Sequence, residues 1–160
     1  MYETDYDLTI RTRAPVETVW DELRTLERLL ENTPTVSSFS VDDDGRHASL
    51  VGGLTRWPVA WRSLAAEAEI VEVDPPHRLD WTLTVAELDL RFAGTFELTP
   101  VSAEETNLTY RGSLRCGDSP VCLLRHVLAG ILEGHMEALA TRLATRAARR
   151  TAAEQALGAA

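Results

Sequence analysis

The sequence predicts an α+β protein in which a curved antiparallel sheet of six or seven strands wraps around one long C-terminal helix. The first observation is a run of good helix formers without proline, from just after Ser119 to about Arg150. The second is a series of segments in which apolar and polar residues alternate, separated by connections of hairpin length. Short connections join antiparallel neighbours, and such strands leave one face apolar. The long helix is therefore expected to cover that face.

The long helix has a clear start and one apolar stripe. Ser119 can accept a hydrogen bond from a free N–H of the first turn, and Pro120 fits the first helical position. At about 100° per residue, the large apolar side chains fall on one side: Val121, Leu124, Leu128, Ile131, Leu132, Leu139 and Leu143. Burying each contributes roughly 1.5–3 kcal/mol. His135 interrupts this stripe in its middle, and the tail from Thr151 to Ala160 is expected to fray.

The N-terminal part is expected to form one strand and two short helices. Apolar and polar residues alternate around Ile10, as in a half-buried strand. Pro15 opens a short helix, and a second short helix covers Leu26 to Glu31. Pro34 ends the second helix, because the residue before a proline is pushed out of the helical region.

Six further strands are expected between the short helices and the long one. Asp43-Asp44-Gly45 is typical of a hairpin turn. A change of phase after Ile70 predicts a β-bulge. The expected strands run from Val36 to Asp42, Arg46 to Leu54, Ala60 to Val73, Leu79 to Val85, Leu90 to Leu98 and Leu108 to Leu114.

Composition indicates one domain, residues 1–150, followed by the tail. The chain has 160 residues, enough for a full core. No apolar run approaches the roughly 20 residues that span a bilayer, so no transmembrane segment is expected. The acidic N-terminus is unlike a secretory signal, which favours a cytoplasmic protein.

Charge and cysteine content exclude several partners. The net charge is −9, and binding to nucleic acid depends on clustered positive charge, so no nucleic acid is expected. Cys116 and Cys122 are the only cysteines, and they form no Cys/His cluster of zinc spacing. We therefore expect no metal and no cofactor. Reduced thiols are the default expectation, with a disulfide between the two cysteines as the alternative.

Several segments, in this order and spacing, resemble the START/Bet v 1-like superfamily, also called SRPBCC. They are Ala14-Pro15-Val16-Glu17-Thr18-Val19-Trp20 after the first strand, Leu26 to Pro34, Glu72-Val73-Asp74-Pro75-Pro76-His77-Arg78-Leu79, Gly94-Thr95-Phe96-Glu97-Leu98-Thr99-Pro100, Glu105-Thr106-Asn107-Leu108-Thr109-Tyr110 and the long helix. The similarity covers roughly residues 4–150. It extends to polyketide cyclase/dehydrase-like proteins and to the members of the superfamily that are associated with carbon monoxide dehydrogenase.

This resemblance implies a helix-grip fold with an apolar cavity between sheet and helix. Members of the superfamily include lipid and hormone binders, aromatase/cyclases and quinone-binding proteins. The superfamily has no universal catalytic motif, so the resemblance assigns no catalytic residue to this chain. Fold similarity alone is a weak argument for function.

The residues expected to line the cavity lie on the inward faces of the helix and strands. They are Trp81, Phe92, Phe96, Tyr110, Leu128, Ile131 and His135. A histidine near neutrality can act as acid, base or hydrogen-bond donor, and a tyrosine can bond a ligand carbonyl. The alternative for each is structural: a core histidine with a protein partner, a tyrosine hydroxyl at the rim, and aromatic rings that fill the core. Gly94 and Gly112 on the same face imply either sheet bending or room for a ligand.

Three functions are consistent with these residues. The first is binding of a hydrophobic small molecule that is lipid-like, quinone-like or aromatic polyketide-like. The second is a cyclase/dehydratase in which His135 and Tyr110 donate and accept protons. The third is an interaction module without a ligand, in which the apolar Trp57–Trp61 loop docks a protein partner or a second copy of the chain.

Overall fold

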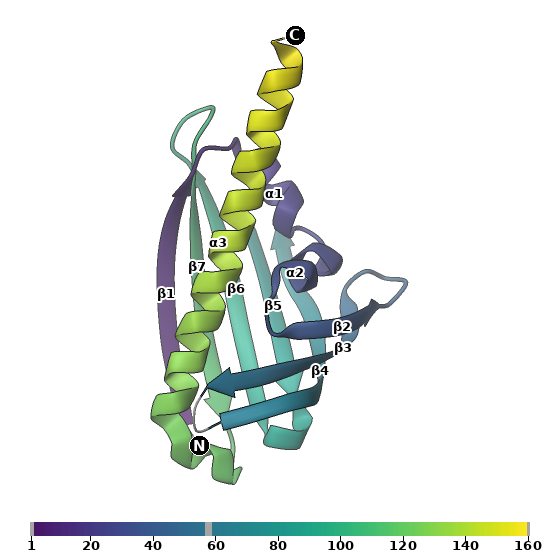
Figure 1. Cartoon of the computed structure of the whole chain (residues 1–160), viewed down its shortest axis with the longest axis vertical. Helices are drawn as coiled ribbons and strands as arrows, with labels where there is room; N and C mark the ends of the chain where they lie inside the picture. The colour runs from purple at the N-terminus through teal and green to yellow at the C-terminus, as the bar shows by residue number, and fades with distance from the viewer. Residues whose placement is uncertain (1, 57–58, 160) are drawn as a thin grey trace.

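Seven antiparallel strands form one curved sheet in the order β1-β7-β6-β5-β4-β3-β2. The computed structural model describes residues 2–56 and 59–159, and describes side chains outside residues 54–62. The strands are β1 (Tyr2–Thr12), β2 (Val36–Val41), β3 (His47–Arg56), β4 (Val59–Asp74), β5 (Arg78–Val85), β6 (Leu90–Pro100) and β7 (Thr106–Cys116). The ribbon in Figure 1 shows the long helix lying across one face of this sheet, as the sequence predicted.

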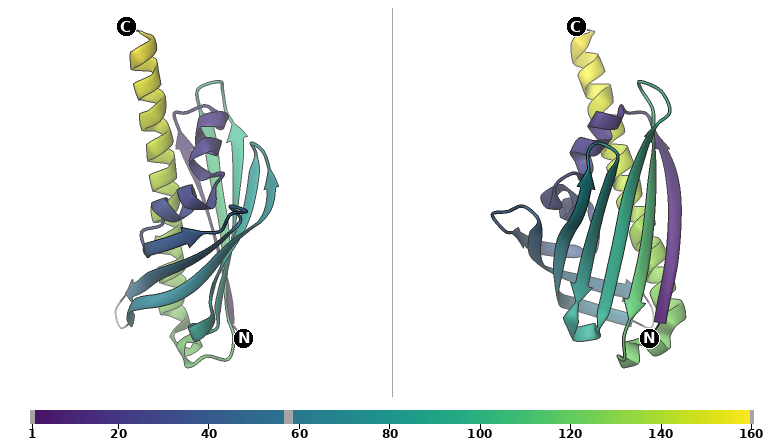
Figure 2. Two further views of the ribbon diagram at one scale, coloured as in Figure 1. Left: turned by 90° about the vertical axis from the view of Figure 1, so that its right-hand side faces the viewer. Right: turned by 180° about the vertical axis from the view of Figure 1, so that it is seen from behind.

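The helices follow the predicted order with different ends. They are α1 (Val16–Leu23), α2 (Leu26–Asn32), the 3-10 helices η1 (Ala86–Leu88) and η2 (Pro120–Leu124), and α3 (Arg125–Gly158). The side chain of Thr25 caps α2 by accepting a hydrogen bond from the Arg28 N–H at 3.3 Å. The views in Figure 2 show α1 and α2 on the same side of the sheet as α3.

The long helix differs from the prediction at both ends. Ser119 does accept a hydrogen bond from the Val121 N–H, at 3.4 Å, but the turn it caps is the 3-10 helix η2. The change of helix type alters the phase, so Leu124, expected on the buried stripe, is 37% exposed. The expected fraying after Arg150 is also not seen, because α3 continues to Gly158 and extends beyond the sheet (Figure 1). The tail is rich in good helix formers, and Arg150 pairs with Glu154 one turn later at 3.1 Å.

Three other expectations concern local features. The predicted bulge in β4 is confirmed by a register shift between Ile70 and Glu72. The expectation of reduced thiols is wrong: Cys116 at the end of β7 and Cys122 in η2 form a disulfide, the alternative that the spacing allowed. For the Trp57–Trp61 loop, residues 57–58 lie outside the described residues and residues 59–61 are described only as backbone of β4.

Most of the buried side chains lie between α3 and the sheet. In α3, the fully buried residues include Leu128, Met136, Leu139 and Leu143. The short helices fill one end of this interior with four leucines that are at most 1% exposed: Leu23, Leu26, Leu29 and Leu30. Space for a ligand is therefore left at the other end, along the first half of α3.

Candidate functional site

An apolar, half-open pocket of about 90 Å³ lies between the first half of α3 and the sheet. One wall is α3 itself, which contributes Leu128, Ile131, Leu132 and His135. These positions recur at helical spacing, so the stripe that the sequence predicted forms this wall.

The rest of the pocket is built from strands and from the segment before β2. Thr35 and Val36 face α3 together with Gly52 and Gly53 of β3, while Leu50, Leu64, Leu83, Phe92 and Leu114 add apolar side chains from five strands. Among the described lining residues, only Thr35 and His135 have side chains that form strong hydrogen bonds. An apolar cleft with few polar groups is typical of small-molecule sites.

His135 is the more distinctive of the two polar residues. Its half-buried ring meets the Phe92 ring edge to face, with centroids 5.3 Å apart and planes at 73°. No hydrogen bond to this imidazole is found among the described residues. Burial disfavours the charged ring and lowers the pKa of His135 from 6.5 to about 4. At neutral pH the residue is therefore a neutral imidazole, with one nitrogen that donates and one that accepts.

Thr35 lies on the opposite wall because two glycines let its backbone approach β3. Its carbonyl oxygen accepts a hydrogen bond from the Gly53 N–H at 2.9 Å. A Cβ at Gly52 would lie 2.6 Å from the same oxygen, so a side chain there would push Thr35 away. The Thr35 hydroxyl has no hydrogen-bond partner within the described part of the chain, and the residue is half-buried.

The sequence did not predict Thr35 or these glycines as part of the site. The signal was present, since a Gly-Gly pair inside a strand often marks the close approach of another backbone segment. Which segment approaches depends on how the loop after α2 folds, and local patterns do not give that information.

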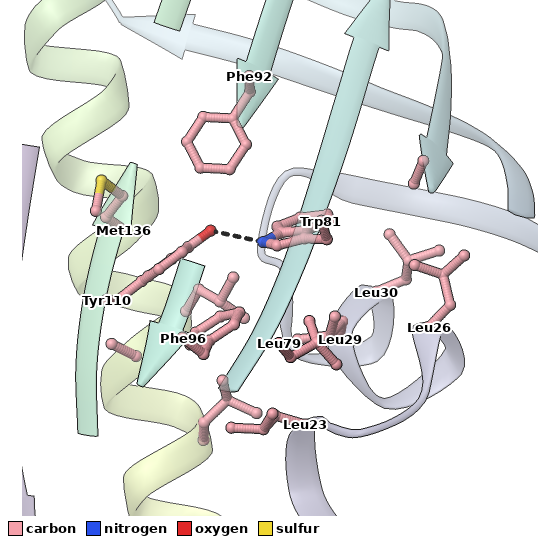
Figure 3. Close-up of a cluster of buried hydrophobic side chains, with 14 of the residues drawn as sticks. Leu23, Leu26, Leu29, Leu30, Leu79, Trp81, Phe92, Phe96, Tyr110 and Met136 are labelled. Carbon is pink, nitrogen blue, oxygen red and sulfur yellow. Dashed lines mark hydrogen bonds between the residues drawn. The ribbon is translucent and has the colours of Figure 1, made fainter. Parts of the chain in front are cut away.

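Three of the aromatic residues expected in the cavity form a packed cluster instead. The Trp81 Nε1–H donates to the Tyr110 hydroxyl at 3.2 Å, and Phe96 stacks on Tyr110 with ring centroids 4.0 Å apart (Figure 3). All three side chains are at most 1% exposed, and none lines the pocket. Burial raises the pKa of Tyr110 well above its usual value, so the hydroxyl stays protonated.

Gly94 and Gly112 serve this cluster. They lie opposite each other on β6 and β7. A Cβ at Gly94 would lie 2.6 Å from Trp81 Nε1, and one at Gly112 would lie 2.8 Å from Met136 Sδ and from the Phe92 ring. Of the two reasons that the sequence suggested, neither sheet bending nor room for a ligand is needed: both glycines make room for side chains of the protein.

Phe92 separates the cluster from the pocket. Its ring contacts Trp81 on one side, with centroids 5.6 Å apart, and His135 on the other. Phe92 also lies edge to face with Tyr110 at 6.2 Å. Of the seven residues expected to bind a ligand, four therefore line the pocket: Phe92, Leu128, Ile131 and His135.

A profile of the family described as "Polyketide cyclase / dehydrase and lipid transport" matches residues 3–148. The chain belongs to this family. The resemblance to the START/SRPBCC superfamily seen in the sequence is thereby confirmed. No curated protein sequence matches the chain.

Solved structures of this superfamily share the fold at low sequence identity. A conserved protein from Geobacillus kaustophilus has a TM-score of 0.78 and 19% identity, with 91% of this chain and 96% of that chain covered. The Zhui aromatase/cyclase from Streptomyces sp. R1128 has a TM-score of 0.73 and 13% identity, with 94% and 96% covered. A START superfamily protein from Mycobacterium smegmatis has a TM-score of 0.66 and 14% identity, with 91% and 97% covered. At these identities the similarity establishes the fold only.

Two further properties limit what this member of the polyketide cyclase family can do by itself. Within residues 2–56 and 59–159, no helix is long and apolar enough to cross a membrane. The same residues contain no group of three or more His, Cys, Asp or Glu side chains placed to hold a metal ion. The chemistry of the pocket therefore depends on His135, Thr35 and the apolar walls.

Proposed function

We propose that the protein binds a hydrophobic small molecule in the pocket between α3 and the sheet. The observation that carries this proposal is the pocket itself: a half-open, apolar space beside a filled core, bordered by one imidazole for which the described residues offer no hydrogen-bond partner. Membership in a family described by lipid transport and polyketide cyclisation supports the same class of ligand.

The volume restricts how a ligand can sit. The pocket measures about 90 Å³, whereas an engineered cavity of about 150 Å³ in another protein holds benzene. The inner part therefore accommodates one end of a ligand, such as a short alkyl group, and the remainder extends through the opening beside α3. Lipid-like, quinone-like and aromatic polyketide-like molecules all have such apolar ends.

A neutral solvatochromic dye tests this proposal. We expect Nile red to bind saturably with a blue-shifted emission. Ile131 lines the pocket from α3, so Ile131→Trp should fill the opening and weaken dye binding by about tenfold. Leu157→Trp is the matched control, because Leu157 lies on the same helix and is 79% exposed. Absence of saturable uptake by the parent, or equal binding by the two variants, would contradict a ligand site in this pocket.

A cyclase or dehydratase activity is the second candidate, and the neutral imidazole of His135 is the observation that favours it. A neutral histidine that borders a ligand pocket can accept a proton from a substrate carbon or hydroxyl. The two-residue mechanism is weaker than expected, because Tyr110 is bonded to Trp81 in the packed cluster and lies outside the pocket lining. His135 would act without it.

Product analysis separates this candidate from simple binding. The protein is incubated with a linear poly-β-ketone, and cyclised or dehydrated products are followed by mass spectrometry. The enzyme proposal requires turnover by the parent and its loss in His135→Gln, with dye affinity retained. Lack of turnover by the parent, or a fully active glutamine variant, would leave the binding function alone.

A further inference from the structure

We infer that the pocket selects an uncharged ligand whose apolar body carries one hydroxyl or carbonyl group, and that this group hydrogen-bonds His135. This inference rests on the proposed binding function and specifies the ligand class of the same site. It is carried by the hydrogen-bonding state of His135 and Thr35 and by the charges of the pocket.

The first step is the vacant hydrogen-bonding capacity. His135 is held by its edge-to-face contact with Phe92, and neither ring nitrogen is hydrogen-bonded to another of the described residues. Polar groups in apolar surroundings are normally satisfied by a partner. A neutral imidazole can donate to a carbonyl oxygen, or accept from or donate to a hydroxyl. A ligand with either group therefore supplies what the surrounding side chains do not.

The orientation of the ring is fixed without using its nitrogens. Phe92 is packed against Trp81, with centroids 5.6 Å apart, and this cluster is at the centre of the core (Figure 3). His135 therefore rests on a rigid ring, and its position does not depend on a hydrogen bond that a ligand would have to break. A group held in advance in this way loses little freedom when a ligand binds.

The third step concerns charge. None of the described lining residues is Asp, Glu, Lys or Arg. A carboxylate or ammonium group inside the pocket would lose its water and gain no counter-ion, which is strongly unfavourable. The imidazole cannot serve as a counter-ion near neutral pH, since burial keeps it uncharged. Charged amphiphiles are therefore excluded unless their charge remains outside the opening.

Thr35 supplies a second polar contact on the opposite wall. Its hydroxyl can accept or donate, and its position is fixed by the backbone hydrogen bond between Gly53 and Thr35. We expect Thr35 to add less than His135, because a free hydroxyl rotates and is more easily satisfied by water. The isosteric variant Thr35→Val removes only the polar group.

Three probes that share one apolar body test the inference: propylbenzene, 4-propylphenol and the 4-propylbenzoate anion, titrated into the whole protein by calorimetry at pH 7.5. We expect 4-propylphenol to bind about 3- to 10-fold more tightly than propylbenzene, the usual gain for one hydrogen bond. The benzoate should bind at least about 100-fold more weakly than the phenol. In His135→Leu the advantage of the phenol should disappear while propylbenzene still binds. His126→Leu is the matched control, because His126 is an exposed histidine of the same helix.

Each outcome has a distinct meaning. If none of the probes binds, the proposed binding function fails and this inference fails with it. If all three bind equally, or the benzoate binds best, binding stands and the inference is overturned. If the phenol keeps its advantage in His135→Leu, the role given to His135 is overturned, even though the pocket still prefers a hydroxyl group.

Discussion

Gly94→Ala is expected to destabilise the fold strongly, although it adds only one methyl group. The added Cβ would lie 2.6 Å from Trp81 Nε1 and 2.9 Å from the Tyr110 hydroxyl oxygen, the two atoms of the buried hydrogen bond (Figure 3). Overpacking a core costs roughly 1–3 kcal/mol, and separating two buried polar partners costs roughly 1–3 kcal/mol. The two costs overlap, so we expect a loss of about 2–4 kcal/mol in the free energy of unfolding.

Urea unfolding followed by circular dichroism measures this loss. Gly134→Ala is the matched control: it makes the same chemical change in α3, where an added Cβ meets no atom within 4 Å. Alanine is the better helix former, so the control should gain about 0.5–1 kcal/mol. Opposite signs for the same substitution would identify contact, rather than loss of glycine flexibility, as the cause.

A double mutant tests the reasoning further. In Trp81→Phe the indole N–H is absent, so the alanine methyl at residue 94 has more room. Adding Gly94→Ala to Trp81→Phe should therefore cost at least about 1 kcal/mol less than adding it to the parent. A parent-like unfolding midpoint for Gly94→Ala, or strictly additive losses in the double mutant, would refute the packing argument.

The remaining predictions concern acid, redox state and a buried hydroxyl. The pKa of His135 falls from 6.5 unfolded to about 4 folded, so its contribution is complete above pH 6.5 and is lost as the pH falls towards 4. At about 1.36 kcal/mol per pKa unit the loss reaches about 3 kcal/mol, and His135→Leu should remove this pH dependence from urea unfolding. Reducing the disulfide between Cys116 and Cys122, six residues apart, should cost about 2 kcal/mol in urea unfolding. Thr12→Val, which removes the 2.9 Å bond to the Ala144 carbonyl, should cost about 1 kcal/mol in the same assay.

Each of these expectations has its own contradicting result. An identical pH profile for the parent and His135→Leu between pH 7 and 4 would show that this imidazole is not the group that titrates. A double serine variant of the two cysteines is the control for reduction, and it should no longer respond to dithiothreitol. Equal stability of Thr12→Val and the parent would mean that the hydrogen bond between β1 and α3 contributes nothing net.

The sequence was sufficient for the sheet because alternation of apolar and polar residues is a local property. The inward positions of β5, β6 and β7 were read correctly from this alternation, and so was the bulge after Ile70. The start of α3 could not be read in the same way. Ser119 and Pro120 fit the first turn of either helix type, and the disulfide from Cys122 to β7 is a contact between elements.

The site was only half predictable, for a related reason. Alternation says which face of a strand points inward, but it does not say what lies opposite each position along the strand. Trp81, Phe96 and Tyr110 point inward as expected, yet they meet one another and the end of the interior that α1 and α2 fill. Phe92 and His135 lie nearer the start of α3, where no short helix covers the sheet. Whether an inward residue belongs to the core or to the pocket thus depends on how far α2 reaches across the sheet.

That dependence also explains why the pocket retains an imidazole. A histidine on the apolar stripe of α3 would be costly in the filled half of the interior, since its nitrogens would be buried without partners. At residue 135 the neighbouring space opens to the surface, so the ring keeps its contact with Phe92 while its nitrogens stay accessible to a ligand or to water. The same geometry makes the two roles separable by experiment: acid sensitivity of unfolding measures the burial of His135, and the preference for a phenol over propylbenzene measures its use in binding.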